Sequence, residues 1–385
     1  PEQQGLLYAG TERGAYYSSD NGRNWNSLQL DLPIVPVTDL QVKGDDLVVA
    51  TQGRGFWILD DLAVLRQQAA GLDAEQLHLF APGASHRLLA GGRAEDPGSA
   101  GTNPHPGVSF FYHLPSDVEE PESLTLAVYR GDDSDPIWTW SGAPGVSDGD
   151  ADAGESDAVD TAVLPTQAGL QRHVWNLEYP GMDRFEGLIL WADMKSGPVA
   201  VPGAYRAELK LGEERHEVSF EVLPDRRAKA PAEAYAAQFD FVSESRDLLS
   251  RTHQEITRIR RLRSQLDSVS ERLGTAAGEA VIGDIEALST ALTAIEEALY
   301  QTKNESRQDP LNFPIRLNNK LVSLMRTVAQ DDRGPTQQAW AVKNELSTAI
   351  EAELAKLDTI YAERVPALNE AIRETGLAMI AVESD

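Results

Sequence analysis

The stretch Ser18-Ser19-Asp20-Asn21-Gly22-Arg23-Asn24-Trp25 decides the fold of the first part of the chain. Its spacing is S-x-D-x-G-x-x-W, and Asp and Gly at these places favour a tight turn. Short runs of strand-forming residues surround this turn on both sides. They cover residues 6–10, 15–18, 25–30, 37–42, 46–51 and 55–60. Short strands at such regular intervals predict an all-β repeat.

The repeat is incomplete within this chain. Residues 7–11 and 48–52 occupy equivalent places, so the two rounds amount to the last one to two blades of a β-propeller. A propeller closes with about four to eight blades, and an isolated blade leaves strand edges and an apolar face uncovered. We therefore expect residues 1–66 to be completed by an N-terminal propeller portion of the same protein, in the same or a separate chain.

Composition excludes several classes of function. The chain has 34 basic and 61 acidic residues, a formal net charge of −27, which disfavours binding to nucleic acid or anionic lipid. It contains no cysteine, which excludes disulfides, thiolate metal sites and cysteine nucleophiles. No apolar run reaches the ~18 residues of a membrane span.

Residues 76–224 show longer strands with period-2 patterning, which predicts one buried and one solvated face per strand. Val218, Phe220 and Val222, for example, fall on one face. The number of such strands predicts an immunoglobulin-like antiparallel β-sandwich. Four tryptophans are expected in its core: Trp138, Trp140, Trp175 and Trp191. Residues 141–161 are rich in acidic and small side chains and predict a mobile surface loop.

Residues 226–385 are predicted to form an antiparallel helical bundle. Apolar side chains at three-four spacing mark three long helices, over 237–273, 281–299 and 346–372, and a shorter helix lies near 317–328. The pattern favours a bundle that buries its own apolar stripes. The alternative is a homo-oligomer in which these stripes pack against a second copy.

The motif and several other segments resemble a known family. The spacing at residues 18–25 is that of an Asp-box, and the similarity extends over residues 7–12, 36–40, 47–61, 169–180 and 201–206. These segments resemble the closing blades of large bacterial BNR-repeat proteins, which are related to the sortilin-type propeller and often labelled glycosyl hydrolases. The resemblance implies an extracytoplasmic location: periplasmic, outer-surface or secreted.

The Asp-box is interpreted as structural. Ser18, Asp20 and Gly22 form the turn, and Trp25 is expected to pack between neighbouring strands of the blade. These residues identify the family that the chain resembles more securely than they identify an activity.

A glycosidase would need two carboxylates that face each other across a sugar at about 5 to 9 Å. Asp39 begins a strand and is the catalytic candidate in this chain. Asp60 and Asp61 end a strand near Arg54, and such carboxylate–arginine pairs are usually structural. An active site would therefore depend mainly on blades outside this chain.

Metal binding is not favoured. Asp148, Asp150 and Asp152 begin like a calcium loop, but Ala153 and Val159 replace the Gly and Glu that such a loop needs at positions six and twelve. We interpret this stretch as a solvated acidic loop, with calcium as the alternative, and expect no other cofactor. The histidines lack metal-ligand spacing. Four arginines on the first long helix are read as a salt-bridged face: Arg258, Arg260, Arg261 and Arg263.

These observations favour a binding and scaffolding protein that recognises a peptide, a protein or a glycan, because each recognisable motif has a structural explanation. The alternative is a glycoside hydrolase whose catalytic carboxylates lie mainly in the other blades. A peptidase is not supported, since the chain shows neither its nucleophile nor its metal motif.

Overall fold

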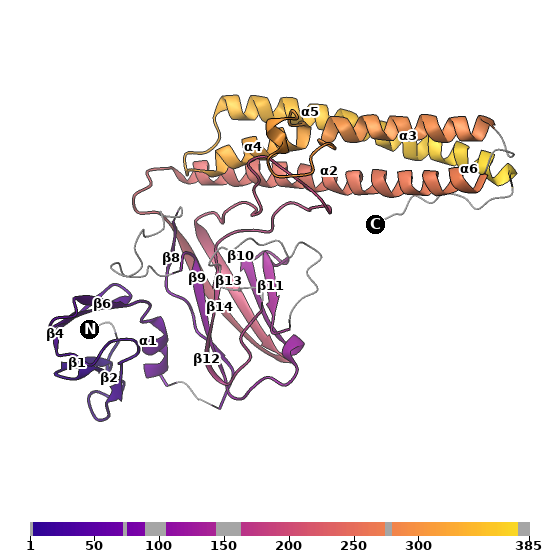
Figure 1. Ribbon diagram of the computed structural model, residues 1–385. Coiled ribbons are helices and arrows are strands. Elements are labelled where there is room, and N and C mark those ends of the chain that lie inside the picture. Colours follow the sequence, from indigo (N-terminus) through magenta and orange to yellow (C-terminus); the bar gives the residue numbers. More distant parts are fainter. Residues whose placement is uncertain (1–2, 72–74, 89–104, 144–162, 274–278, 376–385) are drawn as a thin grey trace. The chain divides into compact units, whose positions relative to one another are not determined.

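The computed structural model describes residues 3–71, 75–88, 105–143, 163–273 and 279–375 (Figure 1). Contacts among these residues divide the chain into two compact units. The first holds the described residues before Glu178 together with Pro202–Ala228, and the second holds Glu178–Val201 together with the described residues from Lys229 onward. The described residues combine small antiparallel sheets, a curled half-barrel sheet and a C-terminal set of five helices, which confirms the expected combination of β-sheets with C-terminal helices.

Two three-stranded antiparallel sheets open the first unit. The first sheet has the order β1-β2-β3 and contains Leu7–Thr11, Gly14–Ser18 and Asn26–Ser27. The second has the order β4-β5-β6 and contains Val37–Lys43, Asp46–Thr51 and Phe56–Leu59. Ala15, Leu28, Leu47 and Val49 are among the buried side chains of one shared core. A Cβ on Gly10 would lie 2.5 Å from Cγ1 of Val37, so the first strands of the two sheets approach too closely for any larger residue.

The remaining strands of the first unit form two further sheets. Their bounds are β7 His78–Leu79, β8 Ser85–Arg87, β9 Val108–Leu114, β10 Leu124–Arg130, β11 Trp138–Ser141, β12 Gly169–Trp175, β13 Gly203–Leu211 and β14 Glu214–Pro224. The larger sheet has the order β11-β10-β13-β14-β8, with β8 parallel to β14, and the smaller has the order β12-β9-β7. The predicted alternation is confirmed on β14, where Phe220 and Val222 are buried and Ser219 and Glu221 are exposed.

Aromatic rings fill the space between these two sheets. Phe220 on β14 lies 5.4 Å from Phe110 and 6.4 Å from Trp175, which belong to the smaller sheet. Tyr205 on β13 stacks on the same Phe220 ring at 5.8 Å. Trp175 is therefore a core residue as expected, because both sheets turn their apolar faces toward it.

The second unit is built on a helix of 42 residues, α2 (Ala232–Leu273). The other helices are α3 (Glu279–Leu299), α4 (Leu317–Ala329), α5 (Gln337–Thr359) and α6 (Val365–Glu374). The apolar stripe of α2 faces α3, α4 and α5, and its members Leu249, Ile256 and Leu266 are fully buried. None of the described helices is long and apolar enough to cross a membrane.

The third long helix, expected to run unbroken over 346–372, is interrupted. A π-helical turn, Ile360–Arg364, separates α5 from α6. Pro366 sits in the first turn of α6, and its nitrogen has no hydrogen to donate to the carbonyl of residue 362. A wider turn accommodates the missing bond.

Residues 178–201 form an irregular segment, which we call the strap, that packs on the helices of the second unit. Its only regular feature among the described residues is a single bridge between Glu178 and Val199. Met182, Phe185 and Leu190 are buried in the helical core. Trp191 therefore belongs to the helical unit and not to the core between the sheets, where it was expected, and 44% of its surface is exposed.

Candidate functional site

The Asp-box turn is held together by its own polar groups. Ser18 Oγ donates to Asp20 Oδ1 (2.8 Å) and accepts from the backbone N–H of Gly22 (2.9 Å). Asp20 also accepts from the backbone of Asn24 (2.8 Å), and this bond, followed by that from Ser18, lowers the Asp20 pKa to about 2. Asn21 and Gly22 both have positive φ. The carboxylate is thus fully engaged in shaping a turn.

Trp25 is only partly buried, and 45% of its surface is exposed. The strand that follows it, β3, has only two residues and lies at the edge of its sheet.

Asp39, the catalytic candidate, is exposed on β4. Its Oδ1 accepts from the backbone N–H of Leu40 (2.9 Å). The structure does not bring it together with the four other carboxylates of this region, which gather at the end of the β4–β5 hairpin and at the start of α1 (Ala63–Ala69).

These four carboxylates belong to Asp45, Asp46, Asp60 and Asp61. Asp46 Oδ1 accepts from the backbone N–H of Asp61 (3.3 Å), and Asp61 Oδ1 accepts from that of Ala63 (3.0 Å). Burial raises the pKa of Asp60 and of Asp61, and negative neighbours raise both further, Asp46 for Asp60 and both Asp45 and Asp46 for Asp61. Carboxyl groups with raised pKa values are what a general acid requires.

The basic partner of this cluster is Arg66 and not Arg54. Arg66 forms an ion pair with Asp45 and donates to the carbonyl oxygen of Gly44 (2.9 Å). Arg54 instead lies on the exposed hairpin between β5 and β6, where it donates to the carbonyl of Gly53 (3.4 Å). These bonds tie α1 to the β4–β5 hairpin. The arrangement thus has an evident structural role, consistent with the interpretation of strand-end carboxylates.

The calcium candidates Asp148, Asp150 and Asp152 lie outside the residues that the structure describes. Within residues 3–71, 75–88, 105–143, 163–273 and 279–375, no group of three or more His, Asp or Glu side chains is arranged to hold a metal ion. His173 packs 4.4 Å from Trp140 in the first unit, and His253 lies in the second.

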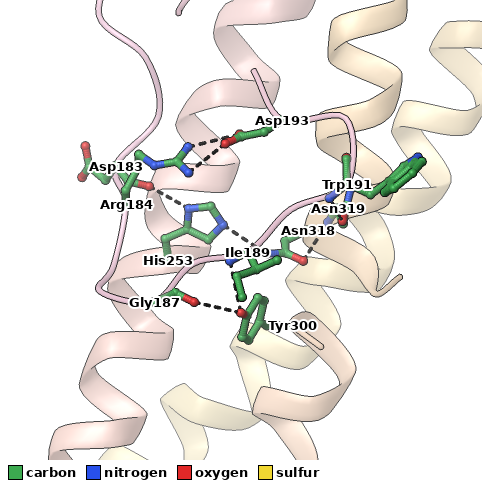
Figure 2. Close-up of polar contacts among 10 residues, drawn as sticks. All are labelled: Asp183, Arg184, Gly187, Ile189, Trp191, Asp193, His253, Tyr300, Asn318 and Asn319. Atoms are coloured by element: carbon green, nitrogen blue, oxygen red, sulfur yellow. Dashed lines mark hydrogen bonds and ion pairs between the residues drawn. The ribbon is translucent and has the colours of Figure 1, made fainter. Parts of the chain in front are cut away.

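His253 is the centre of a buried polar network beneath the strap (Figure 2). Its Nδ1 lies 2.7 Å from the carbonyl oxygen of Asp183, and its Nε2 lies 3.2 Å from Nδ2 of Asn318. Burial lowers the His253 pKa to about 4, so the ring is neutral near pH 7. Only 1% of its surface is exposed, and a ring so enclosed is placed to hold the strap and not to meet a substrate.

Further bonds fasten the strap on both sides of His253 (Figure 2). Asn319 on α4 accepts from the backbone N–H of Trp191 and donates to its carbonyl oxygen, both at 2.7 Å. Tyr300 donates to the carbonyl of Gly187 (3.2 Å) and accepts from the N–H of Ile189 (3.3 Å). A chain segment without regular structure thereby satisfies its backbone groups with side chains of the helices.

An ion pair within the strap completes the network. Arg184 donates to both carboxylate oxygens of Asp193 from its two terminal guanidinium nitrogens, at 3.1 and 2.8 Å, so the strap forms a closed loop over the helices. Sequence reasoning missed this network because its members are far apart in the chain. The available signal was the polar pair Asn318-Asn319 on the apolar side of a short helix.

Comparison of the chain with protein-family models, with curated proteins and with solved structures finds no match.

Proposed function

We propose that the chain is the C-terminal part of an extracytoplasmic β-propeller protein that serves as a binding module or scaffold for a peptide, a protein or a glycan. In this proposal the two small sheets are closing blades, the longer strands form an immunoglobulin-like sandwich, and the helical unit positions or oligomerises the assembly. The Asp-box spacing and the antiparallel three-stranded form of both sheets support the blade assignment.

The observation that carries the proposal is the apolar surface of β6. Among the described strands β6 has a neighbour on one side only, β5. Its side chains Phe56 and Ile58 are 80% and 60% exposed. An exposed strand edge with large apolar side chains favours pairing with further sheet. We therefore expect more blades, from an N-terminal portion of the same protein in the same or a separate chain, to cover this surface.

The test is a structure of the whole gene product by cryo-electron microscopy. Additional sheets packed over Phe56 and Ile58 are the expected result, and a whole protein that leaves both side chains in solvent would rule the proposal out. The variant Phe56→Asp/Ile58→Asp should weaken the assembly. Val342→Asp, which changes an exposed apolar residue in the helical unit, is the matched control.

The second candidate function is a glycoside hydrolase, and the raised pKa values of Asp60 and Asp61 are the observation that favours it. The whole protein would then release reducing sugar from a polysaccharide panel. Substitution of Asp39, Asp60 or Asp61 by Asn would identify the participating carboxylate. Absence of hydrolysis on every substrate would count against an enzyme and leave the binding function.

A further inference from the structure

The two small sheets, β1-β2-β3 and β4-β5-β6, contain matching hairpins. In the first hairpin Thr11 Oγ1 donates to the carbonyl oxygen of Gly14 (3.0 Å). In the second, Thr51 Oγ1 donates to the carbonyl oxygen of Gly55 (2.7 Å). Both bonds join the last residue of one strand to the glycine that leads into the next strand. The pair β1–β2 therefore corresponds to the pair β5–β6.

The matching hairpins correct the repeat expected from the sequence by one residue. Residues 7–11 correspond to residues 47–51 and not to 48–52, because the turn of the second hairpin is one residue longer. After the two glycines the strands continue in step, so Ala15 of β2 corresponds to Phe56 of β6.

Corresponding positions of β2 and β6 face opposite ways. On β2, Ala15 is buried in the core that the two sheets share, and Tyr17 packs against this core. Their counterparts on β6 are Phe56 and Ile58, which are 80% and 60% exposed. A position that faces the shared core in the first sheet thus faces solvent in the second.

The other faces of the two sheets show the same exchange. Leu47 of β5 is buried in the shared core, whereas its counterpart Leu7 of β1 is 39% exposed. Trp25 lies on the same side as Leu7, because a Cβ on Gly22 would be 3.6 Å from Cδ1 of Leu7 and 3.8 Å from Cζ2 of Trp25. The two sheets are therefore stacked head to tail.

A head-to-tail stack leaves one uncovered face of each kind at its two ends. The face at Phe56 and Ile58 is of the kind that the first sheet packs onto the second. The face at Leu7 and Trp25 is of the kind that the second sheet offers to the first. We infer that this outward face of the first sheet is a second docking surface, which receives a further sheet of the same protein. The inference rests on the proposed function and extends it from one covered face to two.

The strands at the sheet edges describe the partner further. The second sheet has β4 beside β5, whereas no described strand lies on that side of β1. The first sheet has β3 beside β2, whereas no described strand lies on that side of β6. Together the corresponding places make a four-stranded sheet, the form of a propeller blade. A partner that covers Leu7 is therefore expected to supply an antiparallel strand to the free edge of β1 as well.

One partner can meet both ends of the stack. A rotation that is repeated from sheet to sheet closes into a ring, and the sheets at the two ends of the remaining arc then contact the two open faces. The large apolar side chains at Leu7, Trp25, Phe56 and Ile58 would all leave solvent in such a ring.

Cysteine labelling tests the second surface, since the chain has no cysteine of its own. The variants Leu7→Cys, Phe56→Cys and Val342→Cys are each treated with a maleimide dye, in this chain alone and in the whole gene product. Mass spectrometry of the labelled peptide gives the rate at each site. In the chain alone all three sites should react readily, because all three side chains are exposed.

In the whole gene product, Leu7→Cys and Phe56→Cys should both react about tenfold or more slowly, because a close-packed sheet excludes the dye. Val342→Cys, in the helical unit, should react as before. Fast labelling of Leu7→Cys with slow labelling of Phe56→Cys would overturn this inference and leave the proposed function standing. Fast labelling of Phe56→Cys would overturn the proposed function and this inference with it. Circular dichroism verifies folding, and Trp25→Cys, on the same face, replaces Leu7→Cys if that variant does not fold.

Discussion

Asn318 Nδ2 lies 3.2 Å from His253 Nε2 in the interior of the helical unit, where the amide donates to the imidazole nitrogen that carries no proton. The carbonyl oxygen of Asp183, 2.7 Å from Nδ1, can only accept, so Nδ1 must be protonated. Nε2 is then the acceptor for the Asn318 amide. A second proton, on Nε2, would make that nitrogen a donor facing the donating amide of Asn318.

The helical unit should therefore lose stability as the pH falls. Burial is the main cause that lowers the His253 pKa to about 4, below the value of about 6.5 in the unfolded chain. Between these values the unfolded chain binds a proton that the folded chain does not. The contribution of His253 to the free energy of unfolding is accordingly fully present above about pH 6.5. It decreases toward about pH 4, by about 3 kcal/mol in total. Urea unfolding followed at 222 nm measures this decrease.

The variant His253→Gln distinguishes the contribution of His253 to the pH dependence of stability from that of other titrating groups. It should reduce stability by about 1 to 3 kcal/mol at neutral pH, because a fitted hydrogen-bond partner is lost, and its urea midpoint should vary less between pH 6.5 and 4.5. His173→Gln is the control, since His173 also has a pKa of about 4 but lies in the first unit. A wild-type slope retained in His253→Gln would assign the pH dependence to other groups.

Glu296 should be essential for the packing of α2 on α3. Replacement by Gln removes the charge that two arginines of α2, Arg260 and Arg263, share, and we expect a loss of about 2 to 4 kcal/mol in the free energy of unfolding. Glu297→Gln, at the exposed neighbouring position, should change it by less than about 0.5 kcal/mol. Denaturant titrations of both variants provide the comparison. Equal changes in the free energy of unfolding for the two variants would mean that the carboxylate shared by the two arginines does not stabilise the packing of α2 on α3.

Asn319 should hold the strap against α4. The substitution Asn319→Ala leaves the backbone N–H and C=O of Trp191 without their partners and should cost about 1 to 3 kcal/mol locally. Hydrogen exchange of the Trp191 amide should become faster, while exchange in the first unit is unchanged. Asn344→Ala, at an exposed position of α5, is the matched substitution. Unchanged protection at Trp191 in Asn319→Ala would contradict this role.

Features with a regular period could be predicted from the sequence. Phe220 and Val222 follow the two-residue repeat of a strand, and Leu249, Ile256 and Leu266 follow the spacing of a helix, so their buried faces were predictable. Even here, local chemistry intervened at Pro366, where a missing N–H changes the helix although the apolar spacing continues.

Features that depend on distant contacts could not be predicted. The strap has no period, and Phe185 is recognised as a core residue only after α2 and α3 are in place. Asp45 pairs with Arg66, 21 residues away, instead of with the nearer Arg54. Such an ion pair depends on the tertiary packing of a helix against a hairpin, and one sequence alone contains no signal for this packing.

Asp61 provides a test between a structural and a catalytic carboxylate. Its pKa is raised mainly by burial, so the folded chain binds a proton more readily than the unfolded one, and stability should increase as the pH falls from neutrality toward that raised value. Asp61→Asn should therefore be slightly stabilising at neutral pH, by less than about 1 kcal/mol. The amide oxygen still accepts from Ala63, and Asn tolerates the positive φ of 59° at this position.

Thermal unfolding of the whole chain at pH 7 and pH 5 measures both the pH dependence of stability and the effect of Asp61→Asn. Asp31→Asn, at an exposed loop position, is the control. A loss of stability in Asp61→Asn would show that the charge is needed near Arg66, whose attraction opposes the effect of burial. A hydrolase that uses Asp61 as its acid would lose activity in the same variant. Replacing a structural carboxylate lowers the stability of the chain, whereas replacing a buried catalytic acid raises it. A variant Asp61→Asn that is more stable but inactive would therefore indicate a catalytic site that is maintained at a cost in stability.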